Sequence, residues 1–142
     1  MDQQELTDIE QIRQLKSRYF RYLDTKNWAA WRTLFTDDMV AKVDDMDEDR
    51  PNLADGGDEF VERVSGMLAG TITVHHGHMP EITLTGPDGA TGIWAMEDRL
   101  EYPGELSVHG FGHYHETYRR SANGWQIATL HLTRLRVDQK QR

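Results

Sequence analysis

Five polar residues stand in segments whose other side chains follow an apolar pattern: Tyr19, Asp24, His75, Asp98 and Arg134. Burying such groups is costly unless each one is hydrogen-bonded or paired with an opposite charge. Together they supply an imidazole, two carboxylates, a phenol and a cation. We therefore interpret them as a candidate site for acid–base chemistry.

His75 is the strongest candidate for a general base. An imidazole with an ordinary pKa of about 6.5 can take up and return a proton at neutral pH. Asp98, on a neighbouring predicted strand, is expected to accept the other imidazole N–H and to orient the ring. Tyr19 is expected to donate its hydroxyl to a substrate carbonyl. The alternatives are a satisfied strand histidine, a surface ion pair for Asp98 and an ordinary core tyrosine.

The remaining two charged residues are expected to support this group. Asp24 follows Tyr19 by about 500° of helical rotation, which places the two side chains about 140° apart. Asp24 is therefore expected at the pocket edge, or as a tether of the turn before Asn27. Arg134 needs a partner if it is buried, and Asp24 and Asp98 are the nearest candidates. A purely structural ion pair is the alternative for Arg134.

Four further residues are expected near the pocket. Trp94 and Met96 precede Asp98 on the same strand face and should form its apolar wall. His113 and His115 share one face of a later strand, and they line the pocket if that face is concave.

A metal site is not expected. The run from His75 to His78 invites a zinc interpretation, but strand alternation turns His75 away from His76 and His78. The acidic loop at 44–58 lacks the remaining ligands of a calcium loop.

The first half of the chain predicts helices. Apolar residues recur at three- and four-residue spacing along one amphipathic helix: Ile9, Ile12, Leu15, Tyr19 and Leu23. Thr7 with Glu10 matches a capping box at its start. A second helix is predicted over 27–35, a strand over 39–43, a polar loop over 44–57 and a third helix over 57–69.

The second half predicts four long strands over 71–86, 90–104, 106–120 and 124–137, separated by turn sequences rich in Gly and Pro. This order predicts an α+β domain in which N-terminal helices pack on a strongly curved antiparallel sheet. A small-molecule pocket is expected between the concave face and the first helix.

Composition restricts the class of protein. The 142 residues fit one domain, 1–142, and the four Trp, five Tyr and four Phe favour a packed core. A net charge of −8 disfavours nucleic acid as a partner. The chain has no cysteine, no apolar signal segment and no run of 18 apolar residues, so we expect a cytoplasmic protein without a membrane partner.

Three motifs carry a resemblance to a known family: D-I-E-x-I-x-Q-L-K-x-x-Y-F-R-x-L-D, H-x-G-H-x-P-E-I-T and A-T-G-x-W-x-x-E-D-x-L. Over residues 7–137 the chain resembles the SnoaL-like group of the nuclear-transport-factor-2-like superfamily, and most closely the bile acid 7α-dehydratases. The placement of an acid in the first helix and a histidine in a strand is also similar to scytalone dehydratase and the lindane dehydrochlorinase. The resemblance makes the five polar residues above the matches to the active-site residues.

The resemblance implies a cone-shaped fold and a hydro-lyase without a cofactor. The implied reaction removes water from a hydroxylated 3-oxo-Δ4 steroid or bile acid derivative at C7, with a coenzyme A thioester as one form of the substrate. The alternatives are an isomerase or polyketide cyclase on the same fold, or a non-catalytic ligand-binding module. The G-x-G at 110–112 lies in a strand pattern, so it does not predict a nucleotide site.

A homodimer or homotrimer is also expected. The strands carry large apolar residues at both odd and even positions: Trp94, Tyr114, Tyr118, Trp125, Ile127, Leu130 and Leu132. Since one strand face cannot hold both sets, the outer face of the sheet is expected to bury against another copy.

Overall fold

The computed structural model describes residues 1–44 and 50–141. In this part of the chain, three helices pack on one six-stranded sheet of order β2-β1-β6-β5-β4-β3. The helices are α1 (Gln3–Asp24), α2 (Trp28–Arg32) and α3 (Gly57–Met67). The strands are β1 (Phe35–Val43), β2 (Ala54–Asp55), β3 (Ile72–Gly86), β4 (Gly89–Glu101), β5 (Leu106–Ser121) and β6 (Gly124–Gln141).

The first helix begins earlier than its capping motif predicts. Asp2 is the N-cap, and its side chain accepts a hydrogen bond of 2.8 Å from the backbone N–H of Glu5. Thr7 lies inside the helix, where its hydroxyl donates to the Gln3 carbonyl. The predicted capping box of Thr7 and Glu10 is therefore wrong, because the first unpaired N–H groups lie upstream of it.

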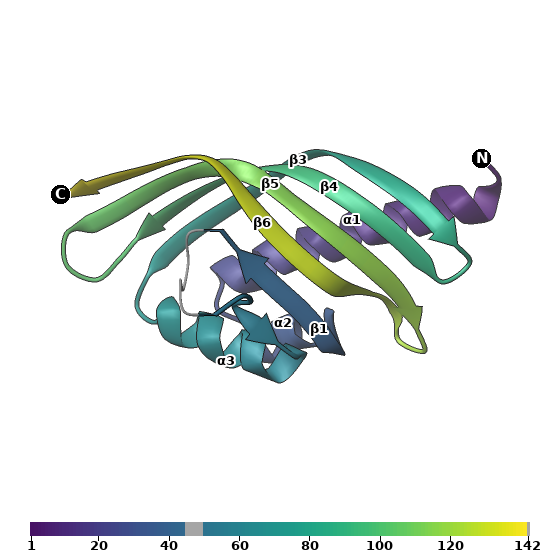
Figure 1. Ribbon diagram of the computed structural model, residues 1–142, viewed down its shortest axis with the longest axis horizontal. Helices are drawn as coiled ribbons and strands as arrows, with labels where there is room; N and C mark the ends of the chain where they lie inside the picture. The colour runs from purple at the N-terminus through teal and green to yellow at the C-terminus, as the bar shows by residue number, and fades with distance from the viewer. Residues whose placement is uncertain (45–49, 142) are drawn as a thin grey trace.

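The four long strands arch over α1, and α2, α3 and β1 gather below this arch near the C-terminal end of α1 (Figure 1). The apolar face of α1 is buried against the sheet through Ile12, Leu15, Tyr19 and Leu23. On β3, a Cβ at Gly77 would lie only 2.6 Å from the Phe20 ring, so glycine permits this close approach of helix and strand. The predicted α+β arrangement, with helices on a strongly curved sheet, is confirmed.

The sheet is mixed rather than wholly antiparallel. Strands β3 to β6 form the predicted antiparallel meander, but β1 pairs with β6 in parallel. β1 also begins at Phe35, inside the segment predicted as helix, because α2 ends after Arg32. The side chains of Phe35 and Met39 are fully buried. Burial of Phe35 against the neighbouring strand favours a strand at this position over a longer helix.

The predicted polar loop contains a short strand. Leu53 donates its backbone N–H to the Ala41 carbonyl, and Gly56 donates to Met39, so β2 pairs with β1. Leu53 and Ala54 are buried, whereas residues 45–49 of the predicted loop lie outside the described residues.

Among the described residues, no group of three His, Asp or Glu side chains is arranged to hold a metal ion.

The seven large residues from which an outer apolar face was predicted do not lie on that face. The seven large residues named above are all buried within the single chain. Tyr118 pairs with Ile127 and Thr117 pairs with Thr129, so Ala128 is an extra residue in β6. This bulge moves the buried positions of β6 from odd to even numbers, which places both sets on the inner face.

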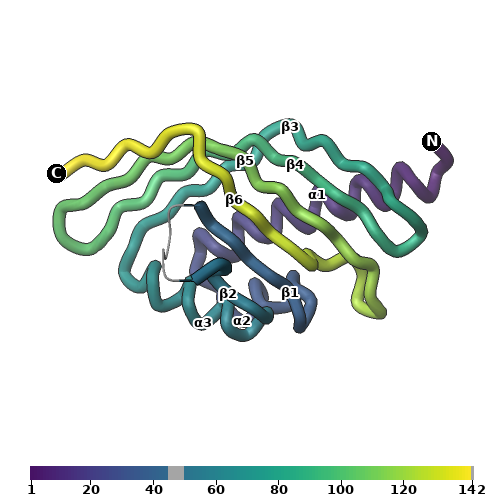
Figure 2. Tube along the Cα trace, in the orientation of Figure 1, coloured from purple at the N-terminus to yellow at the C-terminus, as the bar shows by residue number. Residues whose placement is uncertain are grey.

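The two ends of the described chain lie at opposite ends of the long axis (Figure 2). No helix of the described residues is long and apolar enough to cross a bilayer.

Candidate active site

A cavity of about 360 Å³ lies among the helices and the inner face of the sheet. Its polar residues include Tyr19, His75, Asp98 and Arg134, so the sheet and α1 bring four of the five predicted residues to one space. Most of its wall is apolar, with side chains from both layers: Leu23, Trp31, Phe60, Leu100, Leu130 and Leu132.

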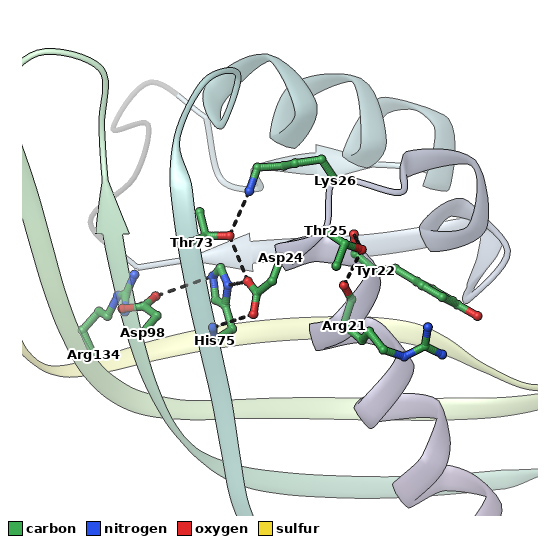
Figure 3. Close-up of polar contacts among 9 residues, drawn as sticks. All are labelled: Arg21, Tyr22, Asp24, Thr25, Lys26, Thr73, His75, Asp98 and Arg134. Carbon is green, nitrogen blue, oxygen red and sulfur yellow. Dashed lines mark hydrogen bonds and ion pairs between the residues drawn. The ribbon is translucent and has the colours of Figure 1, made fainter.

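Asp24, at the C-terminal end of α1, binds His75 of β3 twice (Figure 3). Its Oδ1 lies 2.7 Å from His75 Nδ1, and its Oδ2 accepts the His75 backbone N–H at 2.9 Å. The helix ends here because Lys26 adopts a left-handed conformation with φ of 59°. Thr25 closes the last turn by donating its hydroxyl to the Arg21 carbonyl.

Two further residues hold the Asp24 carboxylate that contacts the imidazole. Lys26 Nζ donates to the Thr73 hydroxyl at 3.0 Å, and that hydroxyl donates to Asp24 Oδ1 at 2.9 Å. Since a carboxylate only accepts hydrogen bonds, His75 Nδ1 must carry the proton in the contact with Asp24. His75 Nε2 is then the basic nitrogen of the neutral ring.

Asp98 of β4 pairs with Arg134 of β6 rather than with the imidazole. Arg134 Nη1 lies 3.2 and 3.3 Å from the two Asp98 carboxylate oxygens, and Asp98 is 2% exposed. His75 Nε2 lies 4.0 Å from Asp98 Oδ2, too far for a hydrogen bond. The predicted His75–Asp98 hydrogen bond is therefore wrong, and Asp24 is the residue that orients the imidazole. The predicted partner of Arg134 is confirmed as Asp98.

Gly110 of β5 provides the space for this ion pair. A Cβ at Gly110 would collide with Asp98 Oδ1 and with Arg134 Nη1. Gly110 also pairs with Asp98 across the β4–β5 ladder, so it lies directly beneath that carboxylate. Gly110 of the G-x-G segment therefore makes room for the Asp98–Arg134 ion pair at the pocket.

Two tyrosine side chains meet at the cavity. The rings of Tyr19 and Tyr114 lie 5.8 Å apart in an edge-to-face arrangement. Burial raises the pKa of Tyr19 well above its usual value, and Tyr114 and Glu116 add to this increase. Burial also raises the pKa of Tyr114, whereas a hydrogen bond with Tyr19 lowers it. Both hydroxyls therefore stay protonated at neutral pH, and each can donate its single proton either to the other tyrosine or to a substrate oxygen.

The predicted role of His113 and His115 as pocket residues is wrong. Burial alternates along β5, and Tyr114 lies on the inner face between these two histidines. His115 instead contacts Thr133 through Nε2 on the outer face. Two inner-face residues, Gly110 and Gly112, have no large side chain, so apolar alternation did not identify the inner face of this part of β5.

Trp94 and Met96 share the inner face of β4 with Asp98 but lie beside the cavity rather than in its wall. Met96 Sδ is 3.8 Å from Arg134 Nη1, and Trp94 Nε1 donates to the Tyr118 hydroxyl at 2.9 Å. Both residues contact side chains near the cavity but do not line it, so the prediction that they form the pocket wall is wrong.

Several site residues were not predicted from the sequence: Thr73, Lys26, Tyr102 and Tyr114. Thr73 could have been found, because it precedes His75 by two residues and so shares its strand face. The contribution of Lys26 depends on the helix C-terminus, which apolar periodicity does not define.

The sequence matches the SnoaL-like domain over residues 4–131. A protein of Gibberella zeae named "Probable cyclase" is 24% identical over 137 residues, which cover 87% of this chain and 89% of that protein.

Among the solved structures that share the fold, two illustrate the similarity. A scytalone dehydratase-like protein of Novosphingobium aromaticivorans has a TM-score of 0.86 at 17% identity, covering 97% of this chain and 91% of that chain. A hexachlorocyclohexane dehydrochlorinase of Novosphingobium barchaimii has a TM-score of 0.79 at 15% identity, covering 96% and 92%. Because the sequence match spans most of the chain, the protein belongs to the SnoaL-like domain family.

Proposed function

We propose that the protein is a cofactor-independent hydro-lyase that removes water from a hydroxylated 3-oxo-Δ4 steroid or bile acid derivative at C7. The observation that carries this proposal is the oriented Asp24–His75 pair at an apolar cavity. A fixed Nδ1–H leaves Nε2 as a base beside a space suited to an apolar substrate.

In the proposed reaction, His75 Nε2 removes a proton from C6, which the conjugated ketone acidifies. The electrons of that C–H bond pass into the enone and form a dienolate. The C7–O bond then breaks, a C6–C7 double bond forms, and the proton on His75 leaves with hydroxide as water. Asp24 stabilises the imidazolium formed between these steps.

The Asp98–Arg134 pair is assigned to the leaving group. Asp98 Oδ2 lies 4.0 Å from His75 Nε2, and once Nε2 carries the proton a hydroxyl between them could accept from Nε2–H and donate to Oδ2. Arg134 balances the Asp98 charge in this buried position, so that carboxylate can accept a hydrogen bond from the hydroxyl.

Tyr19 and Tyr114 are assigned to the substrate carbonyl. Both hydroxyls are protonated donors at the cavity, and the dienolate places negative charge on that oxygen. Donors fixed in place before the reaction stabilise such charge without reorganising.

A cyclase or isomerase is the second candidate, because the Gibberella zeae relative carries a cyclase name. Enolate chemistry needs the same base and the same donors. The two candidates differ in their product, since only dehydration changes the substrate mass by one water.

The test uses a panel of 7α- and 7β-hydroxylated 3-oxo-Δ4 steroids, as free acids and as coenzyme A thioesters. Dehydration is expected to produce dienone absorbance together with loss of water by mass. His75→Ala is the control and should lower kcat by about 10² to 10⁴-fold, the usual contribution of general acid–base catalysis. Binding without turnover across the panel would instead support a ligand-binding module.

We also propose a homodimer or homotrimer. The proposal rests on exposed apolar residues of the outer face instead of the seven buried residues named above. The outer face exposes Ile72, Val74 and Ile93, which are partly or largely accessible in one chain. Sedimentation equilibrium at micromolar concentration tests this. A mass near 16.4 kDa would contradict it.

A further inference from the structure

A fully buried ion pair lies behind the pocket tyrosines. Lys16 Nζ of α1 is 2.6 Å from Glu116 Oε2 of β5, and both side chains are 0% exposed. Glu116 Oε1 accepts a hydrogen bond of 2.7 Å from the Tyr118 hydroxyl, which itself accepts from Trp94 Nε1. Hydrogen bonds therefore hold the carboxylate from two sides.

The Lys16 ammonium also lies against the faces of both pocket tyrosines. Nζ is 3.7 Å from the Tyr19 ring centroid and 3.5 Å from the Tyr114 centroid. A cation on an aromatic face is attracted by the negative face of the ring. Because both contacts share one nitrogen, a single charge restrains the two rings that carry the hydroxyl groups at the cavity.

Stability alone explains this arrangement poorly. Replacing a buried ion pair by apolar side chains of similar volume is often neutral or stabilising. Lys16 occupies a position in the buried stripe of α1 next to Leu15, where an apolar side chain would pack in an ordinary core. Burial lowers the pKa of Lys16 to about 8, while Glu116 opposes this decrease, so the ammonium form prevails at neutral pH.

We propose that Lys16, held by Glu116, positions the Tyr19 and Tyr114 hydroxyls as a paired donor site for the substrate oxygen that gains negative charge. The donor step rests on the proposed function, whereas the positioning of the rings does not. Lys16 is a positioning residue, because it acts on the substrate only through the two tyrosines.

The first test needs no substrate. The protein is labelled with carbon-13 at the Cζ atoms of its five tyrosines, and the signals are assigned with single Tyr→Phe variants. The combined variant Lys16→Met with Glu116→Leu keeps the buried volume and avoids an unpaired charge. The Tyr19 and Tyr114 signals are expected to shift or broaden. The signals of Tyr22 and Tyr102 serve as internal controls.

Unchanged Tyr19 and Tyr114 signals in the folded variant would overturn the proposal. If the combined variant does not fold, Glu116→Gln replaces it, since this change keeps the shape but removes the charge that holds Lys16. The same two signals are read in that variant, with the same expected and contrary results.

The second test measures turnover of a 7α-hydroxy-3-oxo-Δ4 steroid. The combined variant should lose about tenfold or more in kcat, with KM changed by less than about threefold, because the donors act on charge that develops in the transition state. Leu15→Ala is the matched control, since it disturbs the same helix in the core without removing the cation. It should retain kcat at a temperature where it is folded.

The two tests separate the hypotheses. If the native protein turns over no steroid on the panel, the proposed function fails and the tyrosine signals still decide the positioning. If the native protein is active and the combined variant keeps full kcat, the donor role of the pair is wrong.

Discussion

Asp24 binds both the imidazole and the backbone N–H of His75, so one carboxylate fixes the position of this residue and the rotation of its ring. The contact joins the last turn of α1 to the first part of β3, 51 residues later in the chain. Helix end and strand must therefore fold together before the base is oriented.

Asp24→Asn is expected to lower kcat by about 10² to 10⁴-fold, as when the orienting acid of a catalytic triad is neutralised. The amide would present an NH₂ group to one of the three donors that now bind the carboxylate. Steady-state kinetics checks this, with KM close to the native value. Asp38→Asn is the control, because Asp38 pairs with Arg119 on the exposed surface. Turnover within about threefold of native for Asp24→Asn would remove Asp24 from the mechanism.

Asp98→Asn should act mainly on stability, with a smaller loss of kcat than Asp24→Asn. Breaking a buried ion pair costs about 3 kcal/mol, because the remaining charge stays buried without its partner. Adding Arg134→Met to the same chain should recover most of the lost free energy of unfolding. Urea unfolding of the two single variants and the double variant measures the coupling.

Additive losses in this cycle would contradict the ion pair. A rise of KM alone in Asp98→Asn would move Asp98 from assisting the leaving group to binding the substrate.

Tyr19→Phe keeps the ring on α1 and deletes one donor. If the hydroxyl stabilises developing charge, kcat should fall by about 10² to 10³-fold. The free energy of unfolding should change by no more than about 1 to 2 kcal/mol, the value of one hydrogen bond. Measuring kcat and the urea midpoint on the same variant separates this from a core tyrosine, which would alter the midpoint and preserve turnover.

Local patterns predicted most of the fold. The stripe containing Ile12 and Leu15 located α1, and turn residues located the four long strands. The parallel pairing of β1 with β6 was missed, since it depends on contacts between segments about 90 residues apart. The bulge at Ala128 was missed for the same reason: register across a sheet is set by tertiary packing.

The site residues were easier to name than to pair. The resemblance identified all five, but the pairing inferred for His75 gave its imidazole to Asp98, where the structure has Asp24. Helical rotation separates Tyr19 from Asp24 and suggested that Asp24 lies at the pocket edge, away from the contact made by Tyr19. The helix ends at Asp24, and its short side chain instead reaches the adjacent strand β3. Lys16 was also overlooked, although a lysine within an apolar stripe indicates a buried partner.

The buried lysine predicts a pH dependence of stability. Burial lowers the pKa of Lys16 from 10.5 to about 8 in the folded protein, against the effect of Glu116. Between these values the unfolded chain binds more protons than the folded one, so this residue makes the free energy of unfolding rise with pH. Relative to the variant carrying Lys16→Met and Glu116→Leu, the native protein should gain on the order of 1 to 2 kcal/mol between pH 7 and 9.5.

Urea unfolding of both proteins at several pH values measures this difference. The window stays below the ordinary pKa of tyrosine, 10.0, above which the raised pKa values of Tyr19, Tyr114 and Tyr118 begin to lower stability. The variant retains these tyrosines and all other titrating groups, so the difference isolates the buried pair. A difference that stays constant with pH would place the Lys16 pKa outside this window, and one that shrinks would reverse the sign of its shift.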